Sequence, residues 1–196
     1  MLIIEIGDTF SEKGVKNYMK YQIDQSGKIE QMSRDSVIAY SNNSKAAILI
    51  PRKLKRRLQE VFRLHGFTSL FIYYLFSVGI YYLVEGLTAQ ADITVDTEYP
   101  GKDKIIKQFT TALLKNNNKP NHNIEFARIG NRPPAHYAAK DVFDKKTMAN
   151  WILTMEQFIK ALKKTDGRLR ECLATLVDVQ SRSYKKNSSI KRKKSQ

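Results

Sequence analysis

A single aspartate ends an apolar stretch near the middle of the chain, in the sequence ITVDTEYPG at residues 93–101. The segment is otherwise typical of a buried strand, and Pro100-Gly101 predicts the turn that follows it. A carboxylate left dry and unpaired there costs several kcal/mol, so Asp96 needs a metal ion, a cation or a water-filled cleft. Mg²⁺ prefers oxygen ligands and uses one or two carboxylates together with phosphate oxygens and waters. Asp96 is therefore the first candidate metal ligand.

The net charge of the chain suits an anionic partner. Its 196 residues include 34 Lys and Arg against 19 Asp and Glu, which gives a formal net charge of +15. Nucleic acid is the commonest partner for such an excess, and an anionic membrane is the second. Residues 183–196 contain six Lys or Arg and no acid, which predicts a disordered cationic arm that binds phosphates or merely keeps the chain soluble.

The motifs that the chain lacks exclude or disfavour several classes of protein. Cys172 is the only cysteine, so neither a disulfide framework nor a cysteine-rich zinc site is expected, and a reducing compartment, the cytoplasm, is predicted. The first residues lack the basic segment of a signal peptide. The Gly-rich phosphate loops and the nucleophile-elbow motif are absent, which disfavours nucleotide kinases, dinucleotide enzymes and serine hydrolases.

The elements that must position Asp96 follow from the pattern of apolar residues. Residues 1–50 carry strand signals at 2–10 and 17–24 and in three short runs after them, which predicts an antiparallel meander. Pro51 opens an amphipathic helix. Residues 67–84 contain no charge, so they form either a buried helix or a membrane span. A span would separate the strands before it from the strand of Asp96, so a membrane partner is disfavoured.

From Gly86 onward, strands and helices alternate, which indicates a mixed sheet covered by helices. Residues 149–164 then place six apolar side chains at helical spacing, and a further helix follows. These C-terminal helices form a lid on the sheet or an oligomer contact. The predicted parts are a domain at 1–146, a helical extension at 147–182 and the basic tail at 183–196. The six side chains expected in the core are Trp151, Ile152, Met155, Phe158, Ile159 and Leu162.

The order of these elements resembles that of the ribonuclease H-like superfamily over residues 1–146. In ribonuclease H the fourth strand carries a catalytic Asp followed by two polar residues and Tyr, which is similar to DTEY at 96–99. That family has an Ala-acid pair at the start of the helix after the fifth strand, whereas this chain has Ala135-His136. The resemblance predicts an α/β, ribonuclease H-like mixed sheet, with three antiparallel strands followed by alternating strands and helices, and added C-terminal helices.

Two aspartates compete for the first acid of that family, which lies on strand one. Asp8 ends the sequence LIIEIGD and suits the predicted strand order slightly better. Asp24 lies in YQIDQSG, which resembles the Ile-Asp-Glu-Ser-Gly opening of a family of uncharacterised ribonuclease H-like proteins, with Gln25 in place of the acid. Either aspartate could instead initiate a turn, as Asp near a strand end commonly does.

The other positions of the family's site are matched less closely. Glu60 is the candidate for the second acid, because Glu85 would lie at the far end of a helix that runs into the strand of Asp96. Glu60 has arginines three and four residues away, so pairing on a solvated face is the alternative. His136 is the candidate for the fourth position, as a metal ligand, a proton carrier or a histidine bonded to the helix start, with Asp141 and Asp144 as rivals.

The resemblance implies two-metal hydrolysis of phosphodiesters in RNA, DNA or a hybrid, with Mg²⁺ or Mn²⁺ as the cofactor. Asp96 and Asp8 would bind metal, and His136 and Glu60 would complete the catalytic set. A non-catalytic nucleic-acid-binding or adaptor module of the same fold is the first alternative, and a membrane-anchored basic protein is the second. The phosphates would be held by Lys102, Lys104, Arg128, Arg132, Lys191, Arg192, Lys193 and Lys194.

Overall fold

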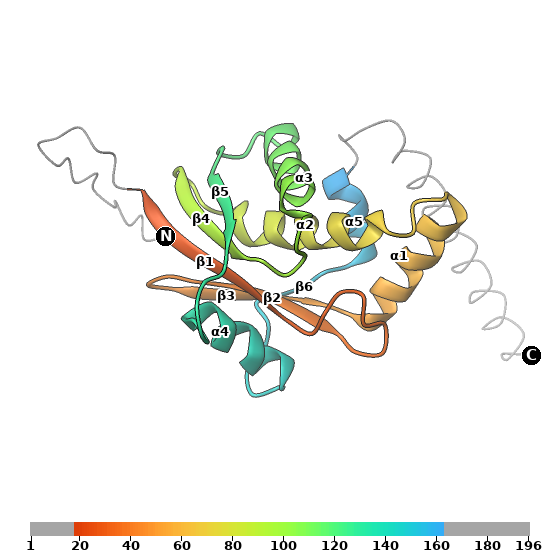
Figure 1. The fold of residues 1–196 in the computed structure, drawn as a ribbon, viewed down its shortest axis with the longest axis horizontal. Coiled ribbons are helices and arrows are strands. Elements are labelled where there is room, and N and C mark those ends of the chain that lie inside the picture. The colour runs from red at the N-terminus through yellow and green to blue at the C-terminus, as the bar shows by residue number, and fades with distance from the viewer. Residues whose placement is uncertain (1–17, 163–196) are drawn as a thin grey trace, which may run out of the picture.

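A computed structural model describes residues 18–162 of the chain, which form a six-stranded mixed sheet with helices on both sides (Figure 1). The strands, in their spatial order, are β5 (Asn123–Ala127), β4 (Ala91–Asp96), β1 (Met19–Ser26), β2 (Ser36–Ser41), β3 (Lys45–Ile50) and β6 (Trp151–Ile152). The helices are α1 (Arg52–Leu64), α2 (Leu70–Val84), α3 (Asp103–Asn116), α4 (Pro134–Phe143) and α5 (Met155–Leu162). The predicted α/β class is confirmed.

The antiparallel meander comprises β1, β2 and β3, each of which pairs with the next. The strand predicted at 17–24 corresponds to β1, and the run at 45–50 is β3. Residues 27–35 connect β1 to β2 through turns, so the strand expected in the first of the three short runs, at 26–32, is wrong. Gly27 ends β1, because it adopts a positive φ of 73°. The strand predicted at 2–10 lies outside the described residues.

A buried lysine fixes this connection. Lys55 of α1 is fully buried, and its Nζ donates hydrogen bonds to the carbonyl oxygens of Lys28 and Gln31, at 3.1 and 2.9 Å, and to Ser36 Oγ at 2.7 Å. Three donors on the ammonium therefore meet three acceptors, as a buried charged group requires. Burial lowers the pKa of Lys55 to about 8. The loop that carries Lys28 is thus held against α1.

Parallel strands extend the sheet on the other side of β1. β4 lies parallel to β1, with Met19 opposite Ala91 and Ile23 opposite Val95, and β5 lies parallel to β4. The helix α3 connects β4 to β5 and packs on α2. Because β1, β4 and β5 run in the same direction, their carboxyl ends meet at one edge of the sheet.

The two faces of the sheet are covered unequally. In Figure 1, α1, α2, α3 and α5 lie on one side, over the main core, and α4 lies on the other. Because successive side chains of a strand alternate, Ile23 and Val95 enter the main core while Asp24 and Asp96 face the side of α4. The contacts of α4 are mainly with β1, β2 and β3, so polar side chains of β4 and β5 remain accessible on that side.

The uncharged segment predicted at 67–84 contains α2, and ten of the fifteen residues of this helix are buried. Gly79 lets the helix approach the sheet, since an added Cβ would lie 2.4 Å from Cδ1 of Ile38. Within residues 18–162, no helix has the length and apolar character needed to cross a membrane.

The helix expected at 149–164 begins only at Met155. Trp151 and Ile152 instead pair with β3 as the short strand β6, and they are 44% and 56% exposed, so their predicted burial in the core is wrong. The cause is a capping box: Thr154 Oγ1 accepts from the backbone N–H of Gln157, and Gln157 Oε1 accepts from that of Thr154. Met155, Phe158, Ile159 and Leu162 are buried in the main core, so part of the predicted extension packs with the sheet domain.

Candidate metal centre

Three carboxylates meet at the carboxyl ends of β1 and β4. Each of Asp24, Asp96 and Glu98 offers a carboxylate oxygen, and these three oxygens all lie within 4.8 Å of one another. Asp24 and Asp96 come next after the paired residues Ile23 and Val95, so the register of the two parallel strands places them side by side. Glu98 follows in the turn after β4, where its N–H donates to the carbonyl of Asp96 at 2.9 Å.

Hydrogen bonds fix the orientation of the two aspartates. The Asp24 side chain is 6% exposed; its Oδ1 accepts from the N–H of Gln25 at 2.6 Å, and its Oδ2 lies 3.2 Å from Nδ1 of His136. Oδ1 of Asp96 accepts from the N–H of Ile129 at 3.0 Å. One oxygen of Asp96 and further lone pairs on all three carboxylates therefore remain for a ligand.

Burial and the charges of neighbouring acids raise the pKa values of two of the three acids, Glu98 and Asp24. The pKa of Glu98 rises to about 7, because the group is buried and because Asp24 and Asp96 lie nearby, with Asp24 also sharing a hydrogen bond. Burial raises the pKa of Asp24, the charge of Asp96 adds to this, and the N–H of Gln25 and the neighbouring His136 oppose it. A cation placed among the three would favour the charged forms and reverse these shifts.

A hollow of about 360 Å³ opens beside the cluster. Its wall is formed by the end of β1 and the turn after it, by Glu98, and by one side of α4. Lys28 and Lys140 line this hollow, so cationic groups lie close to the acids. The hollow's eight lining residues are Gln25, Ser26, Gly27, Lys28, Glu98, His136, Lys140 and Phe143.

Gly27 allows the turn after β1 to pack closely against α4, where both border the hollow. Its φ is 73°, and a Cβ built on it would lie 2.4 Å from the ring of Phe143 and 2.7 Å from the carbonyl oxygen of Asp35. Both the backbone conformation and the space therefore require glycine at this position. The turn can approach α4 closely only because no side chain stands between them.

The acids predicted from the sequence are distributed as follows. Asp96 lies in the cluster, and the strand beside β4 carries Asp24, while Asp8 lies outside the described residues. Glu60 is exposed on α1 and is not a member of the cluster. Glu85 lies 3.7 Å from Lys119, away from the cluster.

His136 lies where the sequence placed it, in the first turn of α4 and at the edge of the site. Its side chain is 33% exposed, and its ring contacts Asp24. Asp141 and Asp144, the other candidates for the fourth position, pair instead with Lys146 and Lys140, at 3.7 and 2.7 Å.

The basic residues predicted to hold phosphates occupy two settings. Arg128 and Arg132 are exposed in the connection from β5 to α4, which also supplies the N–H of Ile129 to Asp96. Lys102 and Lys104 are exposed at the start of α3, with Lys102 Nζ 6.0 Å from the centre of the Tyr73 ring. Lys191, Arg192, Lys193 and Lys194 lie outside the described residues.

Sequence reasoning missed Glu98. It treated this residue as one of the two polar positions of DTEY, because Glu98 lies beyond the strand and its direction depends on the turn. The available signal was its spacing, since two acids separated by one residue across a strand end can turn toward one ligand. The turn that brings Glu98 back is fixed by its N–H bond to the carbonyl of Asp96.

The donor set fits a hard divalent cation. Carboxylate oxygens are the ligands that Mg²⁺ and Mn²⁺ prefer. The imidazole of His136 contacts Asp24 and can orient it, as outer-shell partners of metal ligands commonly do. A divalent ion would stabilise the charged forms of Asp24 and Glu98, whose pKa values are raised by burial and by the neighbouring acids. No protein-family model, curated protein or solved structure matches this chain.

Proposed function

We propose that this protein hydrolyses phosphodiester bonds of nucleic acid with the help of Mg²⁺ or Mn²⁺. The observation that carries the proposal is the meeting of Asp24, Asp96 and Glu98 at the ends of two neighbouring parallel strands, beside a hollow lined by Lys28 and Lys140. Acids that could hold a cation and lysines that could hold a phosphate thus share one site. The net charge of +15 favours a polyanionic substrate.

Each residue of the site has a role that follows from its contacts. Asp24, Asp96 and Glu98 would hold the metal, which when bound supplies charge neutralisation at the phosphate and a more acidic water. His136 would keep Asp24 in place through its Nδ1. Lys28 and Lys140 would bind phosphate oxygens, and Lys140 can do so by exchanging its exposed contact with Asp144.

The order of the elements also supports the proposal. Three antiparallel strands, two helices, a strand that ends in Asp96, then α3, β5 and α4 follow in the order expected for a ribonuclease H-like domain. Under that resemblance, Asp24 is the acid of strand one and His136 replaces the acid of the last helix. We therefore propose a ribonuclease H-like fold together with the activity.

The test is a cleavage assay with the full chain. Labelled single-stranded RNA, single-stranded DNA and an RNA–DNA hybrid are incubated with Mg²⁺, with Mn²⁺ and with a chelator, beside the variant Asp96→Asn. The proposal expects cleavage that requires metal and falls by at least about a hundredfold in the variant. Binding without cleavage of any of the three substrates would overturn it.

A second candidate is a nucleic-acid-binding module of the same fold that performs no chemistry. It is favoured by His136 in place of the fourth acid and by the location of Glu60 outside the cluster. In that case the wild type and the Asp96→Asn variant would bind nucleic acid equally well, and added metal would leave the binding of both unchanged.

A further inference from the structure

The outer face of α3 carries a row of lysines. Lys104, Lys107 and Lys115, called here the lysine stripe, are all exposed, and Gln108, Thr111 and Ala112 lie between them. At 1.5 Å per residue, Lys104 and Lys115 are separated by about 16 Å along the helix axis, and their spacing of eleven residues returns them to one side. The opposite side of α3, with Ile106, Leu113 and Leu114, is buried in the main core.

The lysine stripe has no acidic partners among the described residues. The ion pairs of residues 18–162 involve other lysines, namely Lys119, Lys140 and Lys146. Asp103 is the only acid of α3; one of its oxygens is buried, and it takes part in none of these ion pairs. Three positive charges are therefore available on one exposed helix face.

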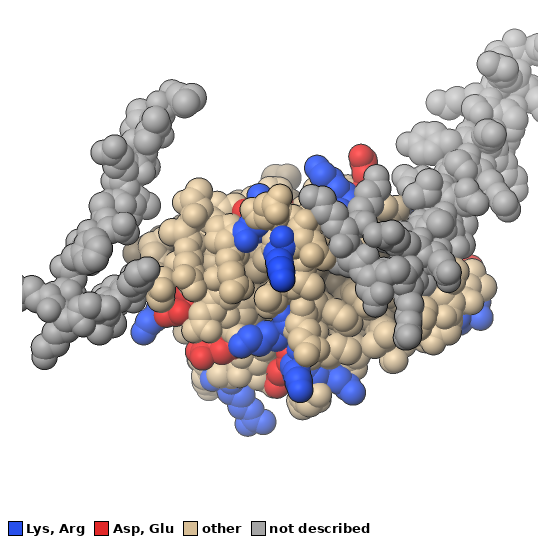
Figure 2. Space-filling view, turned by 90° about the horizontal axis from the view of Figure 1, so that it is seen from above, with Lys and Arg blue, Asp and Glu red and all other residues tan. Residues whose placement is uncertain are grey.

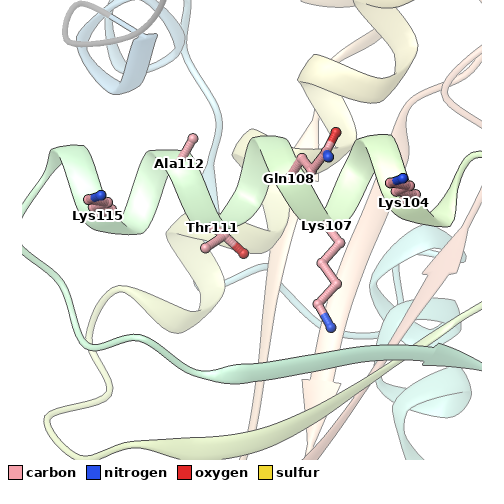
Figure 3. Close-up of a pocket in the computed structure, with 6 residues that line it drawn as sticks. All are labelled: Lys104, Lys107, Gln108, Thr111, Ala112 and Lys115. Carbon is pink, nitrogen blue, oxygen red and sulfur yellow. The ribbon is translucent and has the colours of Figure 1, made fainter.

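These residues also line an open hollow of about 390 Å³ (Figure 3). In Figure 3, the side chain of Lys107 extends away from the helix on the side of the neighbouring strands, and Lys104 and Lys115 mark the two ends of the hollow. Ala112 and the lysine stems give its surface an apolar character, while Gln108 and Thr111 add hydrogen-bonding groups. Seen from above, the side on which α3 lies in Figure 1, basic side chains are spread over the middle of the face (Figure 2).

We propose that the lysine stripe is a second nucleic-acid-binding surface, which holds the sugar-phosphate backbone of a strand without acting on it. Lys, Thr and Gln are among the side chains that commonly contact phosphate oxygens, and apolar side chains between them suit the sugars. A length of about 16 Å corresponds to about five nucleotides of a stacked helical strand, at about 3.4 Å of axial rise each. The inference rests on the proposed function only for the class of substrate, because the stripe requires no metal.

An anionic membrane is the other polyanion that lysines attract, and the composition of α3 disfavours it. A helix that lies on a membrane presents large apolar side chains to the lipid beside its basic ones. Among the described residues, the exposed large apolar side chains belong to other segments, and none belongs to α3. The apolar side of α3 is already occupied by the main core.

The experiment compares two triple variants of the full chain. In the stripe variant, Lys104, Lys107 and Lys115 become Gln. In the control variant, the same change is made at three lysines exposed outside α3: Lys45, Lys53 and Lys146. Both lose three charges and both keep the basic tail. Binding of labelled single-stranded RNA and DNA is measured by fluorescence anisotropy with chelator present, from about 50 to about 200 mM salt. Thermal unfolding checks that both variants fold.

The stripe variant should bind about tenfold or more weakly than the wild type near 0.1 M salt. Its slope of log affinity against log salt should fall by about 2, since each lost phosphate contact removes about 0.7. The control variant should lose less than about threefold. Equal losses in both variants would overturn the inference, and so would a stripe variant that loses binding only to vesicles of anionic lipid.

The outcome is independent of catalysis. The two triple variants are compared in chelator, and both keep the acids, which lie on the other side of the sheet from the stripe. If no substrate is cleaved but the stripe variant binds more weakly than the control variant, the proposed hydrolysis fails and the second surface stands. If cleavage occurs while both variants bind alike, the second surface fails alone.

Discussion

The acids around Asp96 and the lysines of α3 lie on opposite sides of the same strands, and they carry their charge in different ways. Asp24, Asp96 and Glu98 are partly or fully buried and lie within 4.8 Å of one another, and the pKa values of Asp24 and Glu98 are raised by burial and by the neighbouring acids. The lysines of the stripe are exposed and spread along about 16 Å of helix. The acids therefore form one unit that a single substitution should disrupt. The lysines should each contribute separately to the binding of nucleic acid.

The largest effect expected from this difference is the loss of metal binding in Asp24→Asn. Asp24 is the most buried of the three acids, and its carboxylate is held in place by contacts with both Gln25 and His136. Loss of a ligand should exceed the tenfold to hundredfold cost of losing an outer-shell partner, so we expect at least about a hundredfold weaker binding of Mn²⁺. Titration calorimetry measures it.

Asp92→Asn is the matched control for that titration. Asp92 lies on β4 as well, but it bonds to Asn123 and is not part of the cluster. It should bind Mn²⁺ within about threefold of the wild type. Equal affinity in both variants would mean that the three carboxylates do not act as one unit.

The next effect is a dependence of stability on pH in the metal-free protein. The pKa of Glu98 is about 7 in the folded chain, against an ordinary value of 4.5, so the folded state binds more protons between these values. The stability that Glu98 contributes is thus fully present below pH 4.5 and is lost as pH rises through 7. The loss amounts to at most about 3 kcal/mol.

Glu98→Gln should remove that dependence. Urea unfolding with chelator at about pH 5 and about pH 8 should show the variant gaining stability relative to the wild type at the higher pH. Added Mg²⁺ should reverse the order, because the ion favours the charged carboxylates. Glu125→Gln, an exposed acid on β5 that bonds to Thr94, serves as the control and should change neither comparison. If the unfolding free energies of the wild type and of Glu98→Gln changed equally between the two pH values, the raised pKa of Glu98 would be contradicted.

Buried and exposed lysines should also differ in how much they contribute to the stability of the fold. Lys55→Met removes three hydrogen bonds from a fully buried ammonium and leaves carbonyl oxygens of the connection unsatisfied, so it should cost about 2 kcal/mol of unfolding free energy. Lys107→Met, on the exposed stripe, should stay within about 0.5 kcal/mol. Chemical denaturation compares the two, and equal stabilities would show that the Lys55 contacts contribute nothing.

The smallest effect expected is that of one stripe lysine on nucleic-acid binding. Lys107→Gln alone should weaken binding about threefold and lower the salt slope by about 0.7. The three single losses should add up to that of the triple variant, because the side chains share no partner. Anisotropy titrations of the three single variants test this. If one substitution weakened binding as much as the triple variant does, the three lysines would not contribute independently.

The sequence predicted the parts of the fold that depend on local patterns. Strand-forming runs bounded by turn residues predicted β1, β3 and β4, and of the two readings of the long uncharged run the buried helix is the one observed. The start of α5 was wrong because helical spacing extends back to Trp151, whereas Thr154 and Gln157 cap the helix after it. The spacing of apolar residues does not show whether a helix continues or whether a capping residue starts it later.

The candidate site was predicted in part for a similar reason. Asp96 and His136 follow from positions at the end of a strand and the start of a helix, which are local features. The choice between Asp8 and Asp24 depended on which strand pairs with β4, and pairing is a long-range property. Glu98 depended on the path of a turn. Of the lysine stripe, the sequence predicted only Lys104 as a phosphate contact. Which side of α3 is exposed depends on the packing of α3 on α2.

The closeness of Gly27 to Phe143 and Asp35 has a consequence for how freely this chain could vary. In a library that places every amino acid at position 27, only glycine should be recovered among folded variants, since even alanine meets a ring and a carbonyl and must adopt a left-handed backbone. The surface turn that borders the acids is thus as intolerant of change as the interior, and a search for distant relatives should weight this glycine as heavily as the acids beside it.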